Sequence, residues 1–86
     1  MGRILTMARS VVPRPDREKF LERVRARRDY YVGAGCRYWV FEEADLPGAF
    51  VEFTEAQDRA VLSAALKAAP DPVRDPSRLY REVELT

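Results

Sequence analysis

Residues 36–54 carry a strong pattern of hydrophobic and polar positions. Two segments rich in aromatic and β-branched residues, 36–42 and 49–54, enclose a polar turn at 43–48. Such residues favour extended chain, and a turn containing Pro and Gly joins neighbouring strands. The pattern predicts a β-hairpin whose two faces both carry apolar side chains.

Two further strands are predicted near the ends of the chain. Residues 3–12 combine aliphatic and small residues, and Pro13 and Pro15 end this strand because proline cannot donate to a sheet ladder. Residues 78–85 predict a strand with Leu79, Val83 and Leu85 on one side. The prolines and aspartates between positions 70 and 76 predict a stiff extended loop.

Helical periodicity occurs in two places. The first helix is expected to begin at an Asp16 N-cap and to end at Gly33-Ala34-Gly35, where glycine can take the left-handed conformation. Asp58 is the predicted N-cap of the second helix. The predicted buried residues are Phe20, Leu21, Val24 and Tyr31 in the first helix and Val61, Leu62, Ala65, Leu66 and Ala69 in the second.

The predicted order is strand, helix, strand, strand, helix, strand. Right-handed crossovers of this length place both helices on one face of an antiparallel four-stranded sheet. The sequence therefore predicts an α+β, ferredoxin-like βαββαβ fold, with residues 1–86 forming a single domain.

The other face of such a sheet is bare, and the hairpin register decides which side chains lie there. A turn centred between Asp45 and Leu46 predicts that Trp39 lies opposite Glu52. The resulting apolar patch needs a cover, and a second copy of the chain can supply it as a two-fold homodimer. A shift of one residue would exchange the faces. The predicted bare face carries Arg37, Trp39, Phe41, Phe50, Glu52 and Thr54, and the helix-facing side carries Cys36, Tyr38, Val40, Val51 and Phe53.

Composition excludes several kinds of chemistry. The chain has no histidine, which excludes a histidine-ligated metal, a histidine-bound haem and a Ser-His or Cys-His nucleophile. We therefore expect no metal and no cofactor. Cys36 is the only cysteine, so no intrachain disulfide can form, and a reducing cytoplasm is expected.

Charge and hydropathy narrow the range of partners. The net charge of +1, from 15 basic and 14 acidic residues, gives no field that would attract nucleic acid. No apolar run approaches the roughly 20 residues needed to cross a bilayer, and residues 1–10 lack the apolar segment of a secretory signal. We expect a soluble protein that binds neither nucleic acid nor membrane and that pairs with itself.

Three features resemble one known group of proteins. They are Gly35-Cys36 with the aromatic Trp39, the run Asp45-Leu46-Pro47-Gly48-Ala49-Phe50-Val51, and Asp58-Arg59-Ala60-Val61-Leu62. Together they resemble the dimeric α/β-barrel superfamily, the ferredoxin-like group that includes antibiotic-biosynthesis-monooxygenase-like proteins. The resemblance implies a homodimer whose sheets enclose a cavity, and it implies cofactor-independent oxidation of aromatic molecules in some members. This chain departs from the group at three positions: Thr54 and Ala56 replace a frequent glutamate and tryptophan, and Ala65 replaces a frequent histidine.

A second resemblance involves the same strand and helix. Residues 49–53 followed by Asp58-Arg59-Ala60 are similar to the third strand and second helix of RNA-recognition-motif domains. Those domains stack bases on aromatic side chains of the first and third strands. Here Leu5 and Gly48 occupy two such places and only Phe50 matches, so the sequence favours the barrel group.

Glu52 is the best candidate for a catalytic residue. On the predicted bare face its carboxylate needs a partner, and Arg37 on the neighbouring strand is within diagonal reach. Glu52 could act as a general base beside an apolar substrate, with Arg37 stabilising a developing anion. The alternative is a structural Arg–Glu pair. The predicted ligand-binding residues are Arg37, Trp39, Phe41, Phe50 and Glu52.

Two functions remain open at this point. One is a barrel that binds a small apolar or aromatic molecule in its cavity, with or without cofactor-independent monooxygenase-like chemistry. The other is a non-catalytic interaction module in which side chains fill that space. The sequence leaves open whether the protein is an enzyme.

Overall fold

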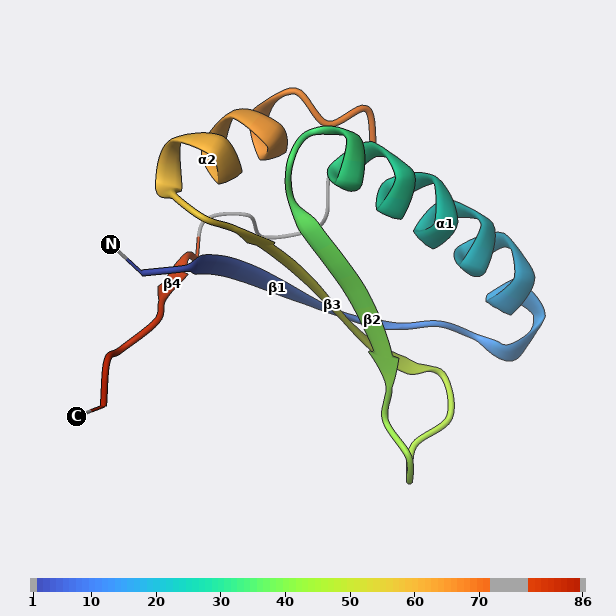
Figure 1. The fold of residues 1–86 in the computed structure, drawn as a ribbon. Helices are drawn as coiled ribbons and strands as arrows, with labels where there is room; N and C mark the ends of the chain where they lie inside the picture. The colour runs from blue at the N-terminus through green and yellow to red at the C-terminus, as the bar shows by residue number, and fades with distance from the viewer. Residues whose placement is uncertain (1, 72–77, 86) are drawn as a thin grey trace.

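The computed structural model describes residues 2–71 and 78–85. Its four strands form one antiparallel sheet in the order β2-β3-β1-β4. Figure 1 shows both helices on one side of this sheet, so the predicted α+β ferredoxin-like arrangement is confirmed. The elements are β1 (Ile4–Val11), the 3-10 helix η1 (Arg14–Asp16), α1 (Arg17–Gly33), β2 (Arg37–Glu42), β3 (Ala49–Ala56), α2 (Arg59–Lys67) and β4 (Tyr80–Arg81).

The helix ends follow local chemistry, with one exception. The Asp58 side chain accepts a hydrogen bond from the Val61 amide at 2.9 Å, which confirms the predicted cap of α2. Gly35 takes a φ of +86° just after α1, as the predicted left-handed stop requires. Asp16 occupies the N-cap position of α1 as predicted, but its side chain makes no capping hydrogen bond. Asp16 belongs to η1, and its backbone is not extended as side-chain capping requires.

The predicted register of the hairpin is wrong by one residue. Trp39 pairs with Phe53 rather than with Glu52, and Arg37 pairs with Glu55. The turn closes through a hydrogen bond from the Glu43 amide to the Ala49 carbonyl at 2.8 Å. Gly48 lies within the turn at a φ of +96°, and it carries no side chain because a Cβ there would lie 2.8 Å from the Val12 carbonyl oxygen.

This shift exchanges the two faces of β3 and leaves those of β2 as predicted. Phe50 and Glu52 therefore lie on the helix side, where Phe50 packs with Phe20 and Val24. Val51 and Phe53 move to the open side. The helix side of the hairpin carries Tyr38, Val40, Glu42, Phe50, Glu52 and Thr54, and the open side carries Arg37, Trp39, Phe41, Val51, Phe53 and Glu55.

The fourth strand is much shorter than the predicted 78–85. β4 pairs only with Ile4 and Leu5, and one further hydrogen bond joins the Glu82 amide to the Arg3 carbonyl. Beyond this point β1 offers no partner, so Val83 and Leu85 lie exposed. Figure 1 shows this C-terminal segment leaving the sheet. Residues 72–77 of the predicted proline-containing loop lie outside the described residues.

Candidate functional site

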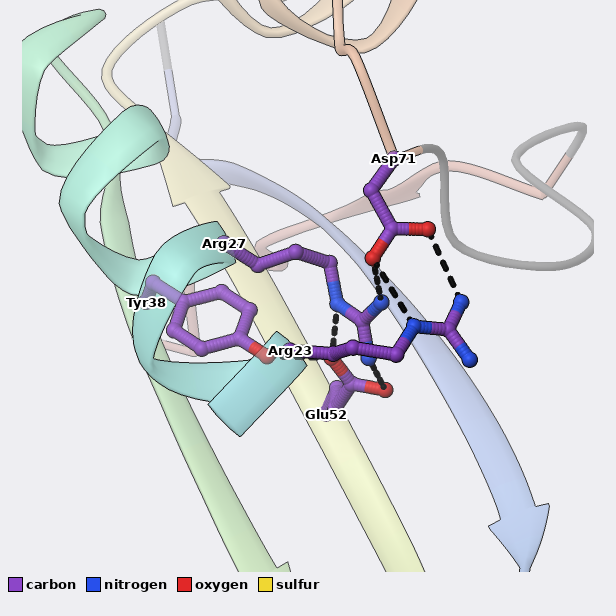
Figure 2. Close-up of polar contacts among 5 residues, drawn as sticks. All are labelled: Arg23, Arg27, Tyr38, Glu52 and Asp71. Carbon is purple, nitrogen blue, oxygen red and sulfur yellow. Dashed lines mark hydrogen bonds and ion pairs between the residues drawn. The ribbon is translucent and has the colours of Figure 1, made fainter. Parts of the chain in front are cut away.

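Glu52, the predicted catalytic residue, lies beneath α1 in a buried ion pair (Figure 2). Arg27 donates two hydrogen bonds to its carboxylate, from Nε at 2.8 Å and from a terminal nitrogen at 3.0 Å. The Tyr38 hydroxyl donates to the same carboxylate from β2. Glu52 is 2% exposed and Arg27 is 5% exposed, so water scarcely reaches the pair.

The network extends from this pair to the segment after α2. Arg27 also binds the Asp71 carboxylate at 2.7 Å, and Arg23, one turn earlier in α1, binds Asp71 at 2.8 Å. Figure 2 shows Asp71 between the two guanidinium groups. Two arginines and two carboxylates therefore balance one another, and they tie α1 to β3 and to the chain that follows α2.

The protonation states in this cluster are set by burial and by the neighbouring charges. Burial is the largest single influence on the pKa of Arg27 and lowers it, but the hydrogen bonds and charge of Glu52, together with Tyr38, outweigh burial and the pKa rises. Burial, and then the Glu52 carboxylate, raise the pKa of the Tyr38 hydroxyl above its usual range. Arg27 is thus charged and Tyr38 is a neutral donor. Both Glu52 oxygens are engaged, an arrangement typical of a structural pair.

Sequence reasoning missed Arg27 as the partner of Glu52. Arg27 lies three residues after Val24 and four before Tyr31, both of them buried in the apolar stripe of α1. This spacing was the available signal, because a cation on a buried stripe needs an acid opposite it. The predicted pairing of Arg37 with Glu52 is wrong, because the register puts the two side chains on opposite faces.

The open side of the sheet carries the remaining predicted residues. Trp39 stacks on Phe53 with ring centroids 5.8 Å apart, and Phe41 meets Phe53 edge-on at 5.8 Å. Met7 lies opposite Phe53 on β1. We call Met7, Trp39, Phe41 and Phe53 the open-face patch; Phe41 is 58% exposed and Met7 is 44% exposed. Exposure of large apolar side chains in contact with one another is typical of an interface or a ligand site.

A polar cluster borders this patch. Glu55 is buried on the open side and lies 3.2 Å from Arg3 and 3.7 Å from Arg37. Arg3 is also bound by Glu82 at 2.9 Å. The Arg37 side chain is two-thirds exposed, so its guanidinium remains accessible to a ligand on this face.

The sheet therefore divides the five predicted ligand-binding residues. Arg37, Trp39 and Phe41 lie together on the open side, while Phe50 and Glu52 lie beneath α1. Within residues 2–71 and 78–85, no group of three or more His, Cys, Asp or Glu residues could hold a metal ion. No helix in that part of the chain is long and apolar enough to span a bilayer.

Comparison with known proteins identifies the fold. No family model matches the chain, and no curated protein matches its sequence. Among solved structures, a conserved protein from Methanosarcina mazei Go1 matches with a TM-score of 0.77 at 17% identity, covering 96% of this chain and 95% of its own. The "Putative antibiotic biosynthesis monooxygenase from Nitrosomonas europaea" matches with a TM-score of 0.75 at 21% identity, covering 96% and 93%. Rv0793 from Mycobacterium tuberculosis matches with a TM-score of 0.57 at 22% identity, covering 99% and 97%.

These similarities define a class of fold. The chain shares its ferredoxin-like α+β fold, which the sequence predicted, with these three structures, one of which is the putative antibiotic biosynthesis monooxygenase. At these identities the similarity establishes the fold alone.

Proposed function

We propose that the protein is a homodimer that pairs the open faces of two sheets and binds a small apolar or aromatic molecule between them. The open-face patch is the observation that carries this proposal. The ligand would contact Trp39 and Phe41, with Arg37 at the border to meet a polar group of the ligand.

Burial of the patch supplies the driving force for pairing. A large apolar side chain that becomes fully buried contributes roughly 1.5 to 3 kcal/mol. In a two-fold dimer every such contact occurs twice, because the same surface is used on both protomers. The exposed Val83 and Leu85 beyond β4 are further apolar side chains that a second copy could cover.

The contacts of Glu52 favour a second candidate, a binding module without catalysis. Arg27 and Tyr38 occupy both carboxylate oxygens of Glu52, so a general-base role would first require these bonds to break. Monooxygenase-like chemistry stays a prediction from the resemblance. The proposed partners do not include nucleic acid. Phe50, which carried the RNA-recognition-motif resemblance, packs beneath α1 and does not offer its ring to a base. The single, buried Cys36 thiol is consistent with a reducing cytoplasm.

Light scattering on two matched variants tests the proposed dimer. Phe41→Ser removes an exposed ring from the open-face patch, whereas Val32→Ser removes an exposed side chain from α1. Wild type and Val32→Ser should be dimers at micromolar concentration, and Phe41→Ser should shift toward the monomer. A monomeric wild type would contradict the proposal.

Fluorescence titration tests whether a small aromatic molecule binds at the open face. Trp39 is the only tryptophan, so its emission reports directly on the open face. A neutral aromatic probe, 2-naphthol, should quench or shift this emission at saturable concentrations in the dimer and not in Phe41→Ser. A dimer with no such response would favour the module in which side chains fill the interface.

A further inference from the structure

The other side of the molecule has a pocket at the end of the sheet that carries the β2–β3 turn. It has a volume of about 500 Å³, which is within the usual range for small-molecule sites. Its walls come from the end of β1, from η1 and the start of α1, and from the turn. The lining residues are Val12, Arg14, Arg17, Pro47, Gly48 and Phe50, and we call this the hairpin-end pocket.

Both charged residues of the lining are arginines, and only one of them is neutralised. Arg17 binds Glu42 through two hydrogen bonds of 2.7 and 2.9 Å. The Gly48 amide donates to the same carboxylate at 2.9 Å. These contacts lower the pKa of Glu42 to about 2, with the Arg17 hydrogen bonds as the main cause, so Glu42 balances Arg17 across the physiological range. Arg14 makes no ion pair with any residue that the structure describes. One cation of the pocket is therefore left for a ligand.

The rest of the lining is apolar and suits a flat ring. Val12 and Pro47 form walls beside Phe50, and the Arg17 guanidinium lies over the Phe50 ring, 5.4 Å from its centroid. A guanidinium held over an aromatic ring presents a flat surface on which a second ring can stack. The pocket thus combines a planar apolar surface with one guanidinium that forms no ion pair within residues 2–71 and 78–85.

We propose that the hairpin-end pocket binds a small aromatic monocarboxylate, with the carboxylate on Arg14 and the ring against Val12, Pro47 and Arg17. The Arg14 guanidinium can donate two parallel, charge-assisted hydrogen bonds to the carboxylate, which is the strongest arrangement available to it. A phosphate ester with two negative charges is a poorer match, because only one cation is uncompensated. Phe50, one of the predicted ligand-binding residues, would act here by supporting the Arg17 guanidinium that lies over its ring.

Amide chemical shifts measured by NMR on the full-length ¹⁵N-labelled protein test whether the hairpin-end pocket binds the carboxylate. The probe is naphthalene-2-carboxylate, and naphthalene-2-carboxamide is its neutral match. The carboxylate should shift the amides of Gly48 and Arg14 in a saturable way, and the carboxamide should bind at least about tenfold more weakly, as expected for the loss of one charged hydrogen bond. Equal affinity for the two probes would overturn the proposal.

Two arginine variants show whether carboxylate binding depends on Arg14 itself or on the positive charge of the protein in general. Arg14→Gln should weaken carboxylate binding by about tenfold or more and leave the carboxamide unaffected. Arg25→Gln, at an exposed arginine elsewhere on α1, should change neither. Undiminished carboxylate binding by Arg14→Gln would contradict the site, as would acetate shifting the same amides as strongly as the naphthalene probe. Because Arg14 is exposed and unpaired among the described residues, its variant should keep the dispersed spectrum of the folded protein.

Discussion

The two sides of the sheet differ in a way opposite to the usual rule of burial. On the helix side, Arg27 and Glu52 are charged and almost fully buried, whereas on the open side Phe41 and Met7 are apolar and exposed. Buried charges persist only when they are paired, and large exposed apolar patches are rare in proteins that act as monomers. The charges on the helix side find their partners within one chain, whereas the open side leaves apolar side chains exposed in one chain.

Removal of Arg27 should have the largest effect on the helix side. Arg27→Ala leaves the Glu52 carboxylate buried without its partner, and we expect the free energy of unfolding to fall by about 3 to 5 kcal/mol. Urea denaturation followed by circular dichroism measures this loss. Arg28→Ala, at an exposed neighbour whose only ion pair among the described residues is with exposed Asp29, is the control and should change stability by about 0.5 kcal/mol or less.

A double replacement distinguishes the pair from the packing around it. Arg27→Met with Glu52→Leu removes both charges at once, so that no buried carboxylate is left without its arginine. This variant should recover most of the stability that Arg27→Ala loses. A double variant as unstable as Arg27→Ala would mean that the network contributes more than the neutralisation of Glu52.

Truncation at the centre of the open-face patch should affect assembly more than folding. Phe53 contacts both Trp39 and Phe41, so Phe53→Ala should weaken dimerisation by more than tenfold, as expected for a central aromatic residue of an interface. Analytical ultracentrifugation over a concentration series measures the dissociation constant. If that constant is the same as in wild type, the pairing surface lies elsewhere.

The fold was more predictable from the sequence than the site. Hydrophobic period and the Asp58 cap were enough to predict the helices and the order of the strands, because these features depend on neighbouring residues. The faces of β3 depend on a single residue of register, which the alternation of residues in the hairpin does not define. The close approach of Gly48 to the Val12 carbonyl is likewise a contact between distant parts of the chain, which no local pattern reveals. Arg27 was missed for a similar reason, because its acid partner lies 25 positions away in another element.

Asp71 gives a smaller and pH-dependent test of the helix side. Its carboxyl is partly exposed, so Asp71→Asn should lower the free energy of unfolding by only about 0.5 to 1 kcal/mol. Hydrogen bonds from Arg23 lower the pKa of Asp71 below its ordinary value of 3.8. A carboxyl with a lowered pKa contributes stability above its ordinary pKa and loses it as the pH falls through the folded-state pKa.

The difference in stability between wild type and Asp71→Asn should therefore change with pH in a defined direction. Wild type should be more stable than Asp71→Asn at pH values above 3.8, and the difference should disappear in more acidic solution. Denaturation curves of both proteins across this range give the answer. A difference that grows on acidification would contradict the ion pairs of Asp71 with Arg23 and Arg27.

Tyr31, one of two neighbouring tyrosines of α1, provides the smallest expected effect. The Tyr31 hydroxyl is buried and has no hydrogen-bond partner among the described residues, and burial raises its pKa to about 12. Tyr31→Phe should therefore be neutral or slightly stabilising. Tyr30→Phe, which removes a 2.7 Å hydrogen bond to the Ala65 carbonyl, should cost about 1 kcal/mol. Thermal denaturation of the two variants side by side measures the contrast.

We propose above all that a second copy of the chain covers the open side of the sheet. Its most direct test is an isotope-filtered NOE spectrum of an equimolar mixture of ¹³C-labelled and unlabelled protein, which detects only contacts between chains. This pairing predicts intermolecular cross-peaks from the ring protons of Trp39, Phe41 and Phe53. Cross-peaks that come from the exposed residues of α1 or α2 instead, or a spectrum without any, would contradict it.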